Sequence, residues 1–232
     1  MTRLIILAAA MFFGAVAPGG AQENPVVVEL FTSQGCSSCP AADKIMHELV
    51  DRDDVIALAL HVDYWDYIGW KDPFGDPIHA KRQRAYALQA GRRSIFTPEM
   101  VVQGQTDIVG AKPMKLGEAI DAYTGKPSPV SLKLIRTGDT LTIAAKRTSA
   151  VTGAVVVHLL RYTPQATTEI KRGENRGKTL TYVHIVEGWQ VLGTWDGSAP
   201  LAMTAKVTGT KPVVVILQRP KAGPILAAAR LR

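Results

Sequence analysis

The order of apolar and polar residues gives the chain a first half with alternating strand and helix patterns and a second half with strand patterns alone. Short apolar runs at 26–31 and 54–62 predict strands that are buried on both faces. Between them, residues 41–52 carry their apolar side chains on one side of a helical repeat. A helix between two such strands is the crossover that parallel pairing requires. The pattern therefore predicts a parallel β-α-β unit.

Helices and short strands alternate through the rest of the first half. Helical patterns cover 79–90 and 113–123, and strand patterns cover 100–103 and 106–109 with a tight turn between them. The strand at 100–103 is expected to run antiparallel to the first two strands. The first half is thus predicted to be an α/β unit with the element order β-α-β-α-β-β-α.

The second half begins after residues 125–129, whose Gly and Pro content is typical of a linker. Strand patterns then follow one another with turn residues between them, at 130–136, 140–146, 155–162, 179–186, 201–207, 213–218 and 224–231. Regularly spaced strands of this kind are typical of a β-sandwich. We therefore predict an all-β sandwich-like domain over residues 130–232.

The amino terminus has the features of a cleavable export signal. Residues 1–21 combine Arg3, an apolar run and small residues before a predicted cut after Ala21. The apolar run is short for a membrane span. Hydrophobic residues make up 47% and charged residues 20% of the 232-residue chain, as in ordinary globular proteins. We expect a periplasmic or secreted protein without a membrane span.

A pair of cysteines follows the first strand directly. Cys36-Ser37-Ser38-Cys39 comes after a short turn and opens the helix at 41–52, where free backbone N–H groups and the helix dipole stabilise a thiolate. A strand, a tight turn and a CxxC at a helix start make up the thioredoxin-type redox motif. The predicted fold class is therefore an α/β thioredoxin-like domain over residues 22–124, followed by the all-β sandwich-like domain.

The chain has only two cysteines, so Cys36 can form an intramolecular disulfide only with Cys39. An exported protein meets an oxidising compartment, in which disulfides persist. A bridge that closes so short a loop stabilises the fold little, which favours a redox role over a structural one. In that role Cys36, at the exposed helix start, attacks as a thiolate and Cys39 resolves the mixed disulfide. The expected partners are protein thiols and disulfides or a redox partner protein.

Two alternatives to thiol–disulfide exchange stay open, and neither calls for an organic cofactor. The first is an inert structural disulfide in a non-catalytic protein. The second is copper(I) binding by the two thiolates, since soft ligands select that ion. A zinc site needs about four ligands. None of the histidines lies at metal-ligand spacing from the cysteines, so we predict no zinc site; they are His47, His61, His79, His158 and His184.

Further side chains are candidates for the same site. Glu29 interrupts an apolar strand shortly before the dithiol, where a buried carboxylate can relay protons; the alternative is a hydrogen-bonded structural acid. The segment 63–77 leaves the carboxyl end of the second strand, where α/β sheets place their ligand sites. Its aromatic residues either form a wall of a substrate groove or pack the long connection; they are Tyr64, Trp65 and Trp70.

Four stretches of the chain resemble a group of secreted bacterial thioredoxin-like proteins that form a family of unknown function. They are VELFTSQGCSSCPAAD, HVDYWDYIGWKDPF, TPEMVVQG and GENRGKTLTYVHIV. Thr97-Pro98 resembles the cis-proline loop of thioredoxin-like proteins, which implies that Pro98 shapes a loop facing the dithiol and that Thr97 contacts substrate backbone. The resemblance implies a fold and an export route but no activity. The Ser-Ser pair between the cysteines departs from thioredoxin itself, so its reduction potential does not carry over.

Charge differs between the two halves. Residues 22–124 hold 10 Lys and Arg against 15 Asp and Glu, whereas residues 125–232 hold 16 against 5. The basic half is expected to dock against its acidic neighbour, and it can also bind an anionic envelope surface. Its basic residues are not interleaved with aromatic ones, so we do not expect nucleic acid as a partner.

Overall fold

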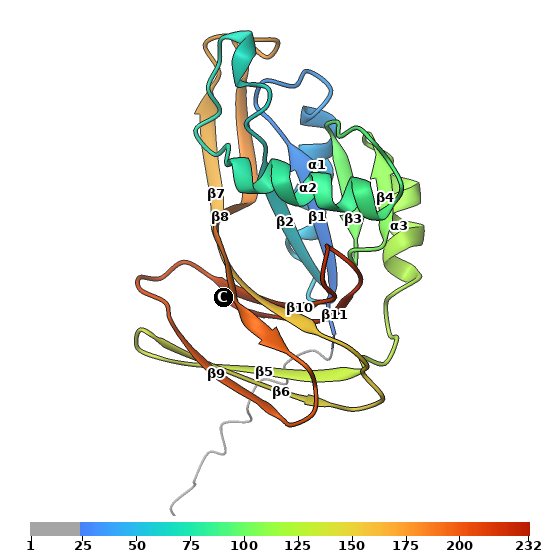
Figure 1. The fold of residues 1–232 in the computed structure, drawn as a ribbon. Helices are drawn as coiled ribbons and strands as arrows, with labels where there is room; N and C mark the ends of the chain where they lie inside the picture. The colour runs from blue at the N-terminus through green and yellow to red at the C-terminus, as the bar shows by residue number, and fades with distance from the viewer. Residues whose placement is uncertain (1–23) are drawn as a thin grey trace, which may run out of the picture.

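The computed structural model describes residues 24–232, which form three α-helices, a short 3-10 helix and eleven strands (Figure 1). The predicted signal peptide, residues 1–21, lies outside the described residues. Most of the regular structure is β, and strands from both halves of the chain share one large sheet. The described residues contain no helix that is long and apolar enough to cross a membrane.

The first half contains the elements that the apolar pattern predicts. Its strands are β1 (Val26–Thr32), β2 (Val55–His61), β3 (Glu99–Val102) and β4 (Thr106–Val109). Its helices are α1 (Pro40–Leu49), η1 (Asp66–Ile68), α2 (Pro77–Gln89) and α3 (Pro113–Asp121). β1 pairs in parallel with β2 and antiparallel with β3, as predicted.

Alternate residues of β1 face two different apolar cores. Val28 and Leu30 pack with α1 and α3 on one side of the sheet. Val27 and Phe31 pack on the other side, in a core that includes Tyr86 of α2. Because successive side chains of a strand point to opposite faces, this central strand is buried on both sides. Burial of both faces explains why the sequence of β1 is a continuous run of mostly apolar residues.

The second half contributes four strands to the same sheet. They are β7 (Val155–Glu169), β8 (Thr179–Trp195), β10 (Val213–Gln218) and β11 (Ile225–Leu231). The strand order is β11-β10-β7-β8-β2-β1-β3-β4, and β8 joins β2 in parallel through Ala59 and Ile185. A sheet built from β1–β4 alone would leave β2 as an open edge, and β8 closes it.

The predicted fold class is therefore wrong. The molecule is not an α/β thioredoxin-like domain followed by an all-β sandwich-like domain, because one mixed eight-stranded sheet runs through both halves. β7 and β8 are 15 and 17 residues long, about twice the length that the sequence predicts, and they carry the sheet from one half to the other. The predicted division into domains at residues 125–129, which lie between α3 and β5 (Val130–Thr137), stays a prediction.

A smaller sheet of three strands covers part of the large one. β6 (Thr140–Arg147) pairs with β5 and with β9 (Leu201–Lys206). Its inner side chains share a third apolar core with residues of β7 and β10. This small sheet lies at the opposite end of the molecule from the loop between β1 and α1 (Figure 1).

Apolar packing joins the acidic and basic halves. Val27 and Phe31 of the first half share a core with Leu160, Val214 and other residues of the second. Of the ion pairs among residues 24–232, only Arg232–Asp53 (3.4 Å) joins the two halves. The expected electrostatic docking is thus replaced by strand pairing and a shared hydrophobic core.

Candidate functional site

The two cysteines form a disulfide at the start of α1. β1 ends at Thr32, and the turn that follows is closed by hydrogen bonds to Ser33, whose carbonyl accepts from the Cys36 N–H (3.2 Å). Cys39 is the residue before the first helical residue, Pro40, and its carbonyl accepts the first helical hydrogen bonds from Ala42 and Asp43. The Cα atoms of the two cysteines lie 5.4 Å apart. The predicted position of the CxxC at a helix start is confirmed.

Both cysteines are buried in this disulfide form. The exposed fraction is 1% for Cys36 and 0% for Cys39, whereas Ser37 and Ser38 between them are exposed. The expectation that Cys36 lies at an exposed helix start is therefore wrong for the disulfide form. The reason is that two further segments, 63–76 and the end of the β7–β8 hairpin, fold against this loop (Figure 1).

The segment 63–76 is tied to the turn that precedes Cys36. The indole N–H of Trp70 donates to the side-chain oxygen of Gln34 (2.9 Å), and the backbone N–H of Gln34 donates to Asp72 Oδ2 (2.8 Å). The same Asp72 oxygen lies 2.8 Å from Nδ1 of His61, the last residue of β2, and both side chains are fully buried. Burial alone would raise the pKa of Asp72, but His61 and the hydrogen bonds lower it below its ordinary value.

Trp65 connects the turn before Cys36 with the predicted proline loop. Its indole N–H donates to Thr97 Oγ1 (2.7 Å), and a Cβ added to Gly35 would lie only 3.0 Å from the Cβ of Trp65. The Thr97–Pro98 peptide bond is cis, as the sequence predicts. The predicted convergence of the CxxC turn, the aromatic segment and this loop is confirmed for these contacts, and the substrate-binding roles of Thr97, Trp65 and Trp70 stay predictions.

Tyr64, the other aromatic candidate, points elsewhere. Its hydroxyl donates to Gln83 of α2 (3.1 Å), and burial raises its pKa to about 12. Gln83 in turn donates to Phe96 O and to the buried Glu99. Among the described residues, no hydrogen bond joins Tyr64 to the turn that precedes Cys36. Tyr64 therefore packs α2 against the segment before β3.

The end of the β7–β8 hairpin is a part of the site that the sequence did not identify. The side-chain amide of Asn175, which is fully buried, donates to the carbonyl oxygens of Gln34 (2.9 Å) and Cys36 (2.8 Å). Glu174 accepts from the backbone N–H of Ser37 (2.9 Å), and its hydrogen bonds with Ser37 hold its pKa below the ordinary value. These contacts span about 140 residues of sequence, so no local pattern could reveal them.

Asp43 is a second residue that sequence reasoning missed. It lies on α1 four residues after Cys39, is only 7% exposed, and accepts from Thr32 Oγ1 (2.9 Å) through one carboxylate oxygen. Burial raises its pKa to about 6, although His61 and the Thr32 hydrogen bond act in the opposite direction. The signal in the sequence was an acid on the apolar face of a helix, at positions i+4 from Cys39 and i−3 from Met46.

Several buried polar atoms near Asp43 have no hydrogen-bond partner among the described residues. They are Oδ2 of Asp43, Nε2 of His61 and the hydroxyl of Tyr182, whose ring lies 4.8 Å from that of His61. Asp43 and Tyr182 also line a cavity of about 250 Å³ between α1 and β8, together with Lys44 and His47 at its edge. Unpaired buried polar atoms are common partners of bound water.

Glu29, the predicted proton relay, lies on the other face of β1. Its carboxylate accepts from Arg82 Nε (2.6 Å) and Nη2 (2.9 Å) and from the hydroxyl of Tyr86, all on α2. It shares this face with Val27 and Phe31, whereas α1 covers the face of Val28 and Leu30. Glu29 is therefore one half of a buried ion pair with Arg82, and the predicted proton relay beside the cysteines is wrong.

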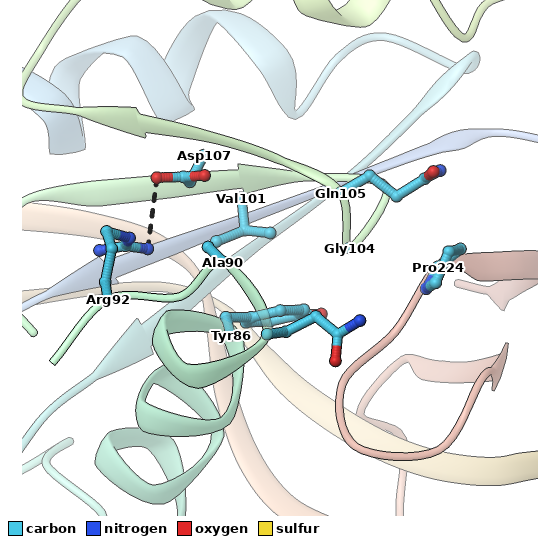
Figure 2. Close-up of a pocket in the computed structure, with 9 residues that line it drawn as sticks. Tyr86, Ala90, Arg92, Val101, Gly104, Gln105, Asp107 and Pro224 are labelled. Carbon is cyan, nitrogen blue, oxygen red and sulfur yellow. Dashed lines mark ion pairs between the residues drawn. The ribbon is translucent and has the colours of Figure 1, made fainter.

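Another hollow in the molecule is separate from the disulfide. Figure 2 shows it between the end of α2, the β3–β4 turn and Pro224. Arg92 lines it and pairs with Glu99 (2.5 Å) and Asp107 (3.3 Å). The β3–β4 turn lies at the opposite end of β1 from Cys36, because Gln103 bonds to Val27. The residues that line this hollow include no Cys or His.

No group of three or more His, Cys, Asp or Glu in residues 24–232 is arranged to hold a metal ion. A two-coordinate copper(I) site would need only the two thiolates, so that alternative stays a prediction.

Packing of Trp65 against the turn before Cys36 can be tested with Gly35→Ala. The added methyl group would lie 3.0 Å from the Trp65 Cβ and 3.2 Å from Ile68 Cδ1, so the turn or the aromatic segment has to move. We expect the free energy of unfolding to fall by about 1–3 kcal/mol, measured by chemical denaturation of the oxidised protein. Gly117→Ala on α3 is the control, because nothing lies within 4 Å of its added Cβ and the helix should gain about 0.5–1 kcal/mol. Equal stabilities of Gly35→Ala and the unaltered protein would contradict close packing at this turn.

The fold and the site together define a class of protein with a mixed β-sheet and a CxxC disulfide between the central strand and its following helix. Within that class, the chain belongs to the family described as "Protein of unknown function (DUF1223)", which matches residues 27–218. The predicted membership of an uncharacterised family is thereby confirmed. No curated protein matches the chain.

Two solved structures are similar to the chain over most of its length. The crystal structure of protein AGR_C_4864 from Agrobacterium tumefaciens shares 31% sequence identity, with a TM-score of 0.77 over 91% of this chain and 96% of that chain. The structure of HBP35 of Porphyromonas gingivalis shares 17% identity, with a TM-score of 0.64 over 90% of this chain and 75% of that chain. The second likeness shows the fold alone.

Proposed function

We propose that the protein is an exported thiol–disulfide oxidoreductase that uses Cys36 and Cys39. The observation that carries this proposal is the disulfide at the start of α1 with a buried carboxylate, Asp43, one helical turn further on. Export is supported by the signal-peptide pattern of residues 1–21. The partners are protein thiols or disulfides.

The reaction begins with the reduced protein and a substrate disulfide. The Cys36 thiolate attacks one substrate sulfur, a mixed disulfide forms, and the other substrate sulfur leaves as a thiolate. Cys39 then loses its proton and attacks Cys36 Sγ, which breaks the mixed disulfide, releases the second substrate thiolate and forms the Cys36–Cys39 bond. The substrate is reduced by two electrons and the protein is oxidised by two. The reverse sequence oxidises a substrate dithiol.

Asp43 is suited to accept the proton that Cys39 loses. Residues four apart on a helix lie on the same face, with Cβ atoms about 5–6 Å apart. A pKa of about 6 makes the Asp43 carboxylate a base at neutral pH that is stronger than an ordinary aspartate. Its second oxygen has no hydrogen-bond partner among the described residues. Asp43 and His47 line the same cavity, which offers the proton a route toward solvent.

An inert disulfide is the second candidate, and the burial of both cysteines favours it. A catalytic disulfide has to be reached by another sulfur atom, so the loop must open during exchange. The inert alternative therefore predicts resistance to mild reductants.

Trapping of mixed disulfides separates the two candidates. In Cys39→Ala the resolving thiol is absent, so substrates should accumulate as mixed disulfides on Cys36. We expect these species on non-reducing gels of periplasmic extracts, and we expect none with the matched variant Cys36→Ala/Cys39→Ala.

A redox titration of the unaltered protein, followed by alkylation of free thiols, would then place its potential against that of the compartment. A disulfide that mild reductants do not open, together with no trapped species in Cys39→Ala, would contradict the oxidoreductase proposal. Two-to-one binding of thiolates to copper(I) in a reduced sample without trapping would favour the copper alternative.

A further inference from the structure

The end of the β7–β8 hairpin, residues 170–178 (the hairpin tip), lies directly beside the disulfide. Asn175 donates to the Cys36 carbonyl (2.8 Å), and Glu174 accepts from the Ser37 N–H (2.9 Å). Gly173 packs on the aromatic segment, because a Cβ added to it would lie 3.2 Å from Ile68 and 3.4 Å from Trp70. The hairpin tip is therefore a fixed neighbour of the CxxC loop.

Free cations surround these contacts. Lys171, Arg172 and Arg176 are all exposed, and none of them forms an ion pair with another described residue. The acid of the hairpin tip, Glu174, is occupied by Ser37. Residues 170–178 hold four cations, Lys171, Arg172, Arg176 and Lys178, against this one acid, so the hairpin tip carries a net charge of +3.

The same cations line an open hollow. Its volume is about 630 Å³, and its walls are Ile68, Lys171, Arg172, Gly173, Glu174 and Arg176. Ile68 comes from η1, which also packs against Gly35 of the turn before Cys36. The hollow therefore combines one apolar side chain, Ile68, with three basic ones. It directly adjoins the CxxC, because Glu174 in its wall accepts from the Ser37 N–H.

We propose that the hairpin tip is a binding surface for acidic polypeptide segments, and that it selects substrates whose reactive cysteine is flanked by Asp or Glu. The substrate-selecting part rests on the proposed function. A polypeptide joined to Cys36 has to leave the sulfur across the exposed surface around Ser37, which the hairpin tip borders. Unpaired cations around a concave surface favour an anionic partner, and Ile68 offers an apolar contact to an extended chain.

Binding of cysteine-free peptides tests the surface without requiring exchange. Two fluorescein-labelled peptides would carry a central serine in place of cysteine, one flanked by aspartates and the other by lysines. Fluorescence anisotropy with the oxidised protein should show Kd lower by about tenfold for the acidic peptide at low salt, and the difference should shrink as salt rises.

The variant Lys171→Gln/Arg172→Gln/Arg176→Gln should lose this preference. The matched control is Lys133→Gln/Lys146→Gln/Lys206→Gln, which removes three exposed lysines from β5, β6 and β9 at the other end of the molecule and should keep it. Equal Kd for both peptides, or equal losses in the two triple variants, would overturn the proposal. So would binding to phosphatidylglycerol vesicles in the absence of any peptide preference, since that result would identify a membrane surface as the partner.

Exchange with the cysteine-containing forms of the two peptides is measured separately. Exchange at equal rates would overturn substrate selection by the hairpin tip while leaving the oxidoreductase proposal intact. Selective binding of the acidic peptide without exchange would support the surface and count against the oxidoreductase proposal. The control variant Lys133→Gln/Lys146→Gln/Lys206→Gln should react with dithiothreitol as the unaltered protein does, because its substitutions lie at the other end of the molecule from the disulfide.

Discussion

Arg82→Met is expected to lower the free energy of unfolding by about 3–5 kcal/mol. Arg82 donates to both carboxylate oxygens of Glu29, and the exposed fractions of the two side chains are 8% and 0%. Its guanidinium also lies 4.0 Å from the ring centroid of Trp189. Removing the arginine leaves a charged carboxylate inside the sheet with only the Tyr86 hydroxyl as a donor, and an unpaired buried charge is costly. Chemical denaturation at neutral pH measures the loss.

Two further variants identify the cause of that loss. In Arg82→Met/Glu29→Met both charges are absent, so we expect most of the lost stability to return. Arg84→Met alters an exposed residue of the same helix and should change stability by no more than about 0.5 kcal/mol. A double variant as unstable as Arg82→Met alone would show that lost packing, rather than the unpaired carboxylate, sets the cost.

The individual elements could be predicted because their signals are local. Val26–Thr32 and Val55–His61 are continuous apolar runs because both faces of these strands are covered, and α1 has one apolar stripe because it covers one face. The parallel and antiparallel pairing of β1 follows from the crossover helix and the later strand. The strand and helix patterns depend only on neighbouring residues, and the pairing of β1 follows from the order of the elements within the first half of the chain.

The partner of β2 on its other side could not be predicted in the same way. β8 reaches it from more than a hundred residues away, through the pairing of Ala59 with Ile185. The outer part of β7 is also hard to recognise, because Thr163–Glu169 is largely exposed and includes Pro164, which lacks the N–H that a ladder uses. The sequence pattern that predicts a strand is a run or alternation of apolar residues that become buried. The outer residues of β7 are largely exposed, so they do not show this pattern.

The residues of the candidate site also fall into two groups, those in short local motifs and those that reach the site from distant segments. Cys36, Cys39 and the cis Thr97–Pro98 bond belong to short motifs, so the sequence identifies them. Asn175 and Asp72 bind the CxxC turn from distant segments and carry no motif of their own. Glu29 and Asp43 show the difficulty most directly, since both are acids among apolar residues. Glu29 points from β1 toward α2, whereas Asp43 lies on α1, the helix that begins at the cysteines. The sequence pattern alone does not distinguish these two positions.

Asp43→Asn is expected to stabilise the protein at neutral pH by about 2–3 kcal/mol. The pKa of Asp43 is about 6 in the folded protein against 3.8 for an ordinary aspartate, so the folded state binds the proton more tightly than the unfolded state. The free energy of unfolding of the unaltered protein therefore falls as the pH rises from about 4 to about 6, and stays reduced above that range. Asparagine has no charge to bury and can still accept from Thr32 Oγ1.

The gain from Asp43→Asn should accordingly be small at about pH 4 and reach its full size by about pH 7. Denaturation at several pH values measures this gain, and the control variant Asp51→Asn, which alters an exposed acid just after α1, should show no such trend.

The variant Asp43→Asn also tests the proposed chemistry. If Asp43 accepts the proton of Cys39, disulfide exchange should slow by about 10²-fold, and the step near pH 6 in the rate profile should disappear. A stabilised variant that keeps the rate and pH profile of the unaltered protein would show that Asp43 is a buried charge without a part in proton transfer.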